Sequence, residues 1–324
     1  MENFHDVGGQ LSGSITKVDR ELSWWEKRVD AIILYLVGKR IVLLDELRCA
    51  TEELEPVEYE RLRHYERNII ILEKLLVEKG FLSRTMLDRK FNERRAQERG
   101  FSASPRHQVH RTHTHEHTSD HGTSEYEWRI DAIQEILVQE GICTVDDIDH
   151  GIEDMDARGE ALGGRIVAKA WTDPVFTRRL LADAKAAISE LNIDTGTFTT
   201  LVALQNTERL HHLVVCTLCS CYPRAILGIP PDWYKSKAYR ARAVRDPRGV
   251  LREFGLYLDA RTVVHVVDST AEMRYFVIPT QPPGTEGMSE EGLAGLVSRD
   301  SLIGAAQARL PKKSGSRTTT EPLS

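Results

Sequence analysis

Apolar residues recur at helical spacing in the first third of the chain. Ile32 and Leu36 fall on one face of a helix with a 3.6-residue period, and residues 69–75 supply a second apolar face. We therefore expect residues 21–98 to be helical. They follow a Gly-rich, polar stretch over residues 1–20 that we expect to be an extended arm.

The pattern changes from helical to strand-like in the second half of the chain. Helical spacing resumes at Glu125 and continues to about Leu191, and after Gly196 it gives way to short runs rich in Val, Thr and aromatic residues. Such runs are typical of strands. We expect strands over residues 199–204, 212–215, 262–267 and 274–278. The predicted fold class is α+β, with a helical N-terminal part followed by further helices and a layered α/β domain.

A polar stretch over residues 101–124 separates the two helical regions. It holds six histidines: His107, His110, His113, His115, His117 and His121. Because it has almost no apolar residues, it cannot bury a core, and we interpret it as a linker between domains at residues 1–100 and 125–309. Residues 310–324 are expected to be a disordered tail. A metal-delivery role for the histidines is the alternative to a simple tether, since imidazole suits cobalt and nickel.

A short repeat lies on both sides of this linker. Arg28-Val-Asp-Ala-Ile32 recurs as Arg129-Ile-Asp-Ala-Ile133, and at the same offset Asp45 matches Asp146. The matches keep one register without gaps, which indicates that one helical unit is used twice, as in a fusion of two ancestral subunits. Chance similarity between two amphipathic helices is the alternative.

Composition and charge exclude several classes of protein. The 324 residues carry 43 Lys and Arg against 49 Asp and Glu, a net charge of −6, which argues against a nucleic-acid-binding protein. The longest apolar run, residues 31–37, is far shorter than the roughly 20 residues of a membrane span. The first residues lack the pattern of a secretory signal. We expect a cytoplasmic protein that binds neither membrane nor nucleic acid.

One basic cluster could suggest binding of nucleic acid, but a subunit interface or a salt-bridge network explains it better. Its residues are Lys235, Lys237, Arg240, Arg242, Arg245 and Arg248.

Three cysteines lie within six residues. Of the five in the chain, Cys216, Cys219 and Cys221 are clustered, whereas Cys49 and Cys143 are isolated. A Cys-x-x-Cys pair alone serves zinc, iron–sulfur and redox chemistry equally, and no second pair completes a zinc site. An odd number of cysteines is a poor disulfide framework, and a bond between Cys219 and Cys221 would be strained.

The spacing favours one metal ion held by a folded loop. Both Cys219 and Cys221 can bind the same ion if the chain folds round it, which also brings the main-chain nitrogens of Ser220 and Cys221 to the metal. Thiolates and amide nitrogens would form a square with Cys216 as the axial ligand. This donor set favours trivalent, octahedral iron or cobalt over tetrahedral zinc and leaves one position open.

These residues resemble a known family. Val215-Cys-Thr-Leu-Cys-Ser-Cys-Tyr-Pro223 is similar to the metal-binding loop of the nitrile hydratase α subunit, and the resemblance extends over about residues 125–306. It includes residues 227–236, 239–248, 268–275 and 284–287. Residues 1–98 resemble the N-terminal half of the β subunit through His5-Asp-Val-Gly-Gly9, Trp25-Glu26 and Asp45-Glu-Leu-Arg48.

The resemblance implies the chemistry of the site. Cys216, Cys219, Ser220 and Cys221 would bind the metal, with Cys219 as a sulfinic acid and Cys221 as a sulfenic acid. Thr217 and Tyr222 look like the cobalt-type loop, so Co(III) is favoured over iron. Arg48 aligns with an arginine that reaches the oxidised cysteines, so Cys219, Cys221 and Arg48 are the expected catalytic residues. In the second copy of the repeat, the position of Arg48 is occupied by Asp149.

The implied activity is hydration of a small nitrile to an amide, with the metal as Lewis acid. Two departures affect the substrate. Arg224 stands where the family usually has Trp. The related thiocyanate hydrolase also looks cationic at this position. A positive residue near the metal would favour an anionic or polar substrate. His64 or Tyr65 stands where an aromatic hydroxyl usually lines the site. Hydrolysis of thiocyanate, or of another small anion, is therefore the alternative activity. A non-catalytic metal-binding or regulatory subunit is an alternative of another class.

One part of the family pattern has no counterpart. The C-terminal β-barrel half of the β subunit, with a second arginine for the oxidised cysteines, matches no segment between residue 98 and the α-like part. We therefore expect a separate subunit to supply it within a hetero-oligomer. A metallochaperone is a further expected partner.

Overall fold

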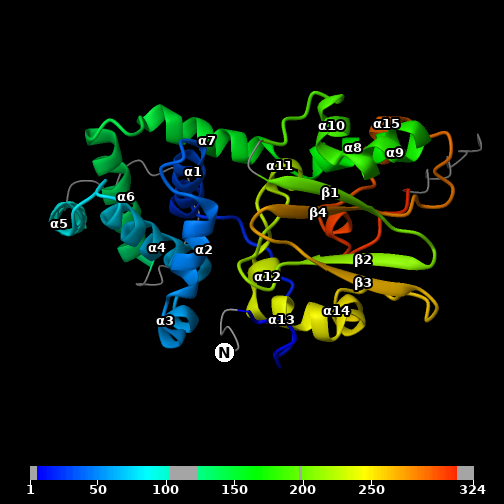
Figure 1. The fold of residues 1–324 in the computed structure, drawn as a ribbon, viewed down its shortest axis with the longest axis horizontal. Coiled ribbons are helices and arrows are strands. Elements are labelled where there is room, and N and C mark those ends of the chain that lie inside the picture. Colours follow the sequence, from blue (N-terminus) through cyan, green and yellow to red (C-terminus); the bar gives the residue numbers. More distant parts are fainter. Residues whose placement is uncertain (1–5, 103–122, 197–198, 312–324) are drawn as a thin grey trace, which may run out of the picture. The chain divides into compact units, whose positions relative to one another are not determined.

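The computed structural model describes residues 6–102, 123–196 and 199–311, which form two compact units. Unit 1 contains Val18–Ala157, and unit 2 combines Val7–Lys17 with the chain from Arg158 onward (Figure 1). Most of the His-rich stretch and of the C-terminal tail predicted from the sequence lies outside the described residues.

All the regular elements of unit 1 among its described residues are helices. Its helices are α1 (Trp24–Gly38), α2 (Leu44–Glu52), α3 (Pro56–Arg61), α4 (His64–Glu78), α5 (Arg84–Ser102), α6 (Thr123–Gln139) and α7 (Val145–Ala157). Their apolar faces share one core that includes Ile32, Leu36, Ile69 and Leu72, so the predicted helical region and its two apolar faces are confirmed. The core also takes in Ile133 of α6, and α6 and α7 therefore fold with the first part of the chain rather than with the strands.

The repeat occurs three times rather than twice. In α1, α4 and α6 the helix ends in the same turn, in which Leu36, Leu76 or Leu137 accepts hydrogen bonds from the backbone five and six residues later. In each turn the fourth residue after this leucine has a positive φ: Arg40 at 57°, Gly80 at 77° and Gly141 at 67°. The unit predicted as a pair, α1–α2 and α6–α7, therefore has a third copy in α4–α5.

Unit 2 is built from parallel strand pairs with helices on their outer sides. Its helices before the strands are α8 (Glu160–Thr172), α9 (Pro174–Ala182) and α10 (Ala184–Ser189). The Asp173 and Asp183 side chains accept hydrogen bonds from backbone N–H groups at the starts of α9 and α10, which fixes where these helices begin. The α9 and α10 helices contact the first strand.

The four strands form two separate parallel pairs. Strand β1 (Thr200–Gln205) pairs with β4 (Met273–Ile278), and β2 (Leu210–Val215) pairs with β3 (Val263–Asp268). All four lie within a few residues of the predicted positions. A parallel pair needs a long crossover. Between β2 and β3 it consists of α11 (Arg224–Leu227), α12 (Asp232–Lys235), α13 (Lys237–Arg245) and α14 (Pro247–Glu253).

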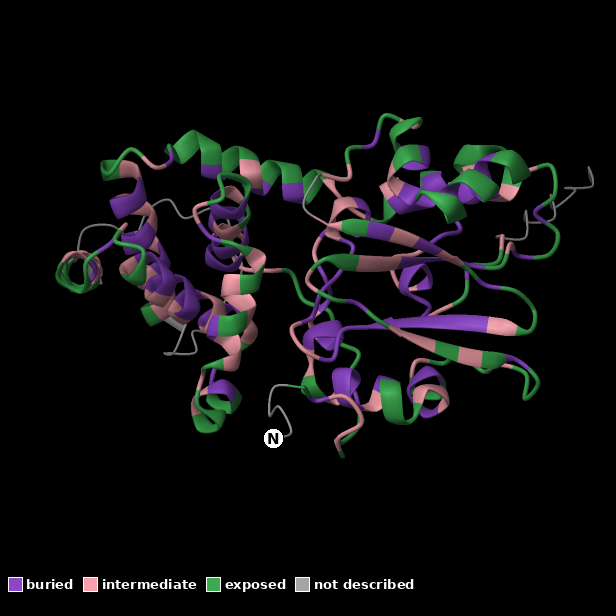
Figure 2. Ribbon diagram, viewed as in Figure 1, coloured by how far each residue is buried: buried purple, intermediate pink, exposed green. Residues whose placement is uncertain are grey.

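The layers of unit 2 bury β2 most completely. Helices α8–α10 and α15 (Glu290–Ala294) lie beside the β1–β4 pair, and α13 and α14 contact β2 and β3 on the other side (Figure 1). The 3₁₀ helix η1 (Ser301–Ile303) contacts β2 and β4. Five of the six residues of β2 are buried (Figure 2). The predicted fold class, a helical part followed by a layered α/β part, is confirmed.

Val7–Lys17 of the N-terminal arm belongs to unit 2. The Gly9 N–H donates to the carbonyl of Ala241 in α13 at 3.0 Å, and the Ile15 N–H donates to the Glu253 carboxylate at 3.2 Å. Lys17 forms an ion pair with Asp300 at 2.7 Å. This segment forms no helix or strand and is fixed to α13 and α14. Among the described residues, none of the helices is both long and apolar enough to span a membrane.

Candidate metal centre

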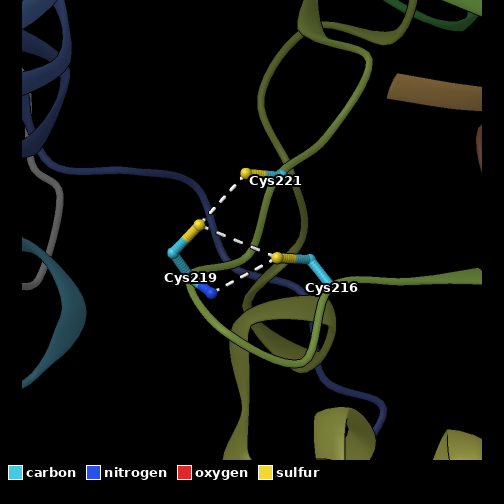
Figure 3. A group of neighbouring side chains, drawn as sticks. All are labelled: Cys216, Cys219 and Cys221. Carbon is cyan, nitrogen blue, oxygen red and sulfur yellow. Dashed lines mark hydrogen bonds between the residues drawn. The ribbon is translucent and has the colours of Figure 1, made fainter. Parts of the chain in front are cut away.

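The loop that follows β2 gathers three sulfur atoms. We call residues 216–221 the claw loop. The sulfur atoms of Cys216, Cys219 and Cys221 all lie within 4.8 Å of one another and point toward a common centre (Figure 3). The Sγ atoms of Cys216 and Cys219 are 3.7 Å apart, and those of Cys219 and Cys221 are 3.1 Å apart. Both distances are much longer than a disulfide bond of about 2.05 Å, and all five cysteines are free.

A strained turn at Ser220 brings the last two cysteines together. Ser220 has φ +72°, in the left-handed region that non-glycine residues rarely adopt. The turn lets Cys219 and Cys221 face the same centre although one residue separates them. The Cys219 N–H donates to the Cys216 sulfur at 3.3 Å, which closes the loop from the other side.

The three thiols share protons unequally. Hydrogen bonds from Cys219 and Cys221 lower the pKa of the Cys216 thiol well below its usual range. Donating to Cys216 raises the pKa of Cys219 to about 12 and raises the pKa of Cys221 well above its usual range, with burial adding to both shifts. A cation at the centre would favour all three thiolates, because it would remove the repulsion that keeps the second and third protons in place.

A buried arginine holds the backbone of the claw loop. Arg240 of α13, only 2% exposed, donates to the carbonyls of Cys216 at 3.2 Å, Thr217 at 2.6 Å and Leu218 at 2.5 Å. The Tyr234 hydroxyl donates to the carbonyl of Cys221 at 2.7 Å. These carbonyls therefore point toward α12 and α13, while the sulfurs point toward their common centre.

Two further contacts fix Thr217. Asp268, at the end of β3, accepts hydrogen bonds from its hydroxyl at 2.7 Å and from its N–H at 3.1 Å. The Thr217 carbonyl accepts a hydrogen bond from the N–H of Val7 at 3.4 Å. The claw loop is therefore held by α12, α13, β3 and the N-terminal arm.

The donor set fits one metal ion. Three sulfurs within 4.8 Å of one another can bind the same ion, and the Ser220 turn lies between two of them. The loop also follows the carboxyl end of a parallel strand, where ligand sites in parallel sheets commonly lie. The structure thus brings together the ligand residues predicted from the sequence, and their assignment as ligands stays a prediction.

The predicted pocket residues lie in both units. Arg224 is the first residue of α11, three residues beyond Cys221, and is partly exposed. In unit 1, Tyr65 is 2% exposed and its hydroxyl donates to the Asp30 carboxylate at 3.1 Å, so it is a core residue of the bundle. His64 packs edge-on against Tyr65 with ring centroids 5.0 Å apart. Their roles toward a substrate stay predictions.

Arg48 lies on α2 of unit 1 with part of its hydrogen-bonding capacity unused. Its Nη2 is 3.5 Å from the Asp45 carboxylate, and its buried Nε has no hydrogen-bond partner among the described residues. A buried N–H without a partner is costly, so Arg48 has a donor to offer to an anion. Its predicted role toward the claw cysteines stays a prediction.

Sequence reasoning did not find the residues that position the claw loop. Arg240 was predicted as part of a basic cluster in a subunit interface or salt-bridge network, whereas it is buried against three loop carbonyls. Asp268 was noted as part of a motif without a role. The sequence placed Asp268 at the end of a predicted strand. That position could have indicated its role, because this strand, β3, pairs with β2, the strand that leads to Cys216.

Two family models match the chain. The model of the nitrile hydratase alpha chain matches residues 124–306. The model of the N-terminal part of the nitrile hydratase beta subunit matches residues 1–119. Over 186 residues, 57% of this chain and 90% of the relative, the chain is 50% identical to the low-molecular weight cobalt-containing nitrile hydratase subunit alpha of Rhodococcus rhodochrous. It is 39% identical to the thiocyanate hydrolase subunit gamma of Thiobacillus thioparus, covering 54% of this chain and 76% of the relative.

The first part of the chain has a relative of its own. It is 34% identical over 89 residues to the nitrile hydratase subunit beta of Pseudomonas putida, covering 26% of this chain and 41% of that protein. More than half of that β subunit therefore lies outside the matched region.

Solved structures agree with the sequence comparisons. A double mutant of the Fe-type nitrile hydratase from Comamonas testosteroni Ni1 matches with a TM-score of 0.57 and 37% identity, covering 62% of this chain and 100% of that chain. A recombinant thiocyanate hydrolase with partially modified cobalt centres matches with a TM-score of 0.54 and 36% identity, covering 63% of this chain and 99% of that one. Because a family model spans more than half of its residues, the chain belongs to the nitrile hydratase family of enzymes.

Proposed function

We propose that this chain is the metal-binding chain of a nitrile hydratase that adds water to the carbon–nitrogen triple bond of a small nitrile and releases the amide. The observation that carries the proposal is the claw loop, in which three sulfurs face one centre beside a strained Ser220 turn. A regulatory subunit that binds no metal would not need three sulfurs gathered at one centre. The cobalt-containing relatives, at 50% and 46% identity, support the same interpretation.

Cobalt(III) is the proposed ion, with iron as the alternative. Cys216, Cys219 and Cys221 would bind it through sulfur, and Ser220 and Cys221 through their main-chain nitrogens. Thr217 matches the cobalt-type loop, although the solved Fe-type relative shows that the fold serves iron as well. When bound, the ion would supply Lewis acidity for activation of the nitrile or of water.

The chain's own residues would orient the ion and stabilise its sulfur ligands. Cys219 as a sulfinic acid and Cys221 as a sulfenic acid would place negative oxygens at the centre. Arg48 is proposed to donate to these oxygens, since its Nε has no other partner among the described residues. Arg240 binds the loop carbonyls on the side of α13, so sulfur and the proposed oxygens would line the open side of the centre.

Thiocyanate hydrolysis is the second candidate, and Arg224 favours it. Arg224 lies three residues beyond Cys221, and its guanidinium would attract an anion more strongly than a neutral nitrile. The similarity to a thiocyanate hydrolase subunit adds support.

The complete enzyme is proposed to contain a second polypeptide. The first part of this chain matches 41% of a β subunit, so the remainder, which the family resemblance identifies as a β-barrel half, would come from a separate subunit in a hetero-oligomer. A metallochaperone is proposed to load the ion.

The test combines peptide mass spectrometry, metal analysis and measurement of substrate turnover. Mass spectrometry of the 216–221 peptide from tagged chain, purified together with any subunit that it retains, should show two added oxygens on Cys219 and one on Cys221, with one cobalt per chain. Amide release from acetonitrile and ammonia release from thiocyanate then distinguish the two activities. Arg224→Trp should lower turnover of thiocyanate at least tenfold relative to the nitrile. Zinc or no metal in the claw loop, or no turnover of either substrate by the assembled protein, would contradict the proposal.

A further inference from the structure

Two histidines face each other across the β2–β3 pair. His212 of β2 is directly opposite His265 of β3 in the parallel register. Their ring centroids are 5.5 Å apart and the rings are tilted by 58°. His212 is 6% exposed, whereas His265 is exposed on its strand. The pair therefore has a rigid inner member and an outer member that solvent reaches.

A chain of buried hydrogen bonds fixes the tautomer of His212. His211 Nε2 lies 2.7 Å from the carbonyl of Gly304, which can only accept, so this nitrogen carries a proton. In the neutral ring, His211 Nδ1 then accepts from the amide nitrogen of Asn206 at 3.1 Å. The amide oxygen of Asn206 is left to accept from the His212 N–H at 2.8 Å and from His212 Nδ1 at 3.1 Å. His212 Nδ1 is therefore protonated.

This arrangement leaves a lone pair at His212 Nε2. No hydrogen bond to that atom occurs among the described residues. Burial and the neighbouring His265 lower the pKa of His212, so its ring is neutral at neutral pH. In a metal-binding histidine, one ring nitrogen usually binds the metal while the other donates a hydrogen bond to a fixed oxygen.

We propose that His212 and His265 bind a labile first-row divalent cation, such as Co²⁺, Ni²⁺ or Zn²⁺, with water completing its coordination. Two imidazoles bound to one ion at about 2.0–2.1 Å in tetrahedral geometry have ring centroids about 5 Å apart, close to the observed separation. Imidazole favours these ions over Mg²⁺ and Ca²⁺.

The site lies on the strand that leads into the claw loop. His212 precedes Cys216 by four residues of extended chain, roughly 13 Å at 3.3 Å per residue. The two centres are therefore separate, and the proposal does not depend on which reaction the claw loop carries out. A labile ion here would be held on the strand that leads to the ion proposed for the claw loop.

The experiment measures Co²⁺ binding by calorimetry to the full-length protein with its claw metal in place. The six linker histidines are replaced by asparagine, since they would bind the same ions, and exchangeable metal is removed by dialysis against EDTA. One Co²⁺ per chain should bind, and Mg²⁺ should not. His265→Gln, a change at an exposed position, should weaken Co²⁺ binding at least tenfold.

The matched control is His150→Gln, which removes an exposed histidine of α7 and should leave Co²⁺ binding unchanged. Turnover is measured in parallel and should be the same in His265→Gln as in the parent, so that failure of this proposal is distinguishable from failure of the proposed activity. Absence of Co²⁺ binding to the parent, or equal affinity in His265→Gln, would overturn it.

Discussion

Asp268 holds Thr217 by two hydrogen bonds, one from the hydroxyl at 2.7 Å and one from the main-chain N–H at 3.1 Å. Thr217 follows the first claw cysteine, and Asp268 is the last residue of β3, opposite Val215 at the end of β2. The shape of the claw loop is therefore coupled to the pairing of these two strands. Residues that orient metal ligands in this way commonly matter almost as much as the ligands.

Replacing Asp268 by alanine should release the claw loop. The Thr217 hydroxyl and N–H, in a residue that is 5% exposed, would both lose their acceptor. We expect a 10–100-fold loss of metal retention against EDTA or of activity, by analogy with other residues that orient metal ligands. Thr217→Ser keeps both hydrogen bonds and serves as the control. Wild-type metal retention and activity in Asp268→Ala would show that the two bonds do not position the loop.

Arg40→Gly should stabilise unit 1. Arg40 has φ 57°, whereas Gly80 and Gly141 stand at the equivalent positions of the other two copies. A left-handed conformation costs a non-glycine residue about 1 kcal/mol, so the free energy of unfolding should rise by about that amount. Urea unfolding followed by circular dichroism measures the change.

The reverse substitutions test the same reasoning. Gly80→Ala and Gly141→Ala place a Cβ in open space, so any loss comes from the backbone conformation alone. Each should lower stability by about 1 kcal/mol. If Arg40→Gly lowered stability instead, a contact of the Arg40 side chain would have to outweigh its backbone strain.

Alkylation should distinguish the two isolated cysteines. Burial raises the pKa of the Cys143 thiol to about 11, while Cys49 is exposed. Because the thiolate is the reactive form, iodoacetamide at pH 8 should modify Cys49 and leave Cys143 unmodified in the folded chain. Peptide mass spectrometry after a timed reaction gives the result, and unfolding in guanidinium should make both react. Rapid labelling of native Cys143 would mean that α6 and α7 open readily.

Glu26 should make the stability of unit 1 depend on pH. Burial opposes its ionisation, but hydrogen bonds and charge from Arg20 and hydrogen bonds from Ser23 outweigh burial and lower the pKa of Glu26. A lowered pKa in the folded state gives stability that is present above the unfolded value of about 4.3 and is lost as the pH falls through the folded value.

Glu26→Gln should therefore be less stable than wild type at pH 7, by about 1–3 kcal/mol, and the difference should shrink below pH 4. Thermal unfolding at several pH values provides the measurement. Glu21→Gln, at an exposed position on the same stretch, should show neither effect. A stability difference that is constant from pH 7 to pH 3 would exclude ionisation of Glu26 as its source.

The sequence by itself determined where the strands lie and which cysteines gather in the claw loop. All four strands lie within a few residues of their predicted positions, because β-branched and aromatic runs reflect burial within a sheet wherever the sheet lies. The claw cysteines could be recognised because all three lie within six consecutive residues. The fusion of two family parts was visible for the same reason, since each part carries its own local motifs.

The tertiary structure decided what holds that loop. Arg240, Asp268 and Val7 contact Thr217 from positions 23, 51 and 210 residues away, and no local pattern records contacts at such separations. The third copy of the helical repeat was harder to recognise, because α4 has Asn68 and Ile70 where α1 has Arg28 and Asp30, although a Leu-Val pair precedes the turn in all three copies. Contacts between distant segments depend on how the chain packs as a whole, and packing is a property of the folded molecule rather than of any short stretch of sequence.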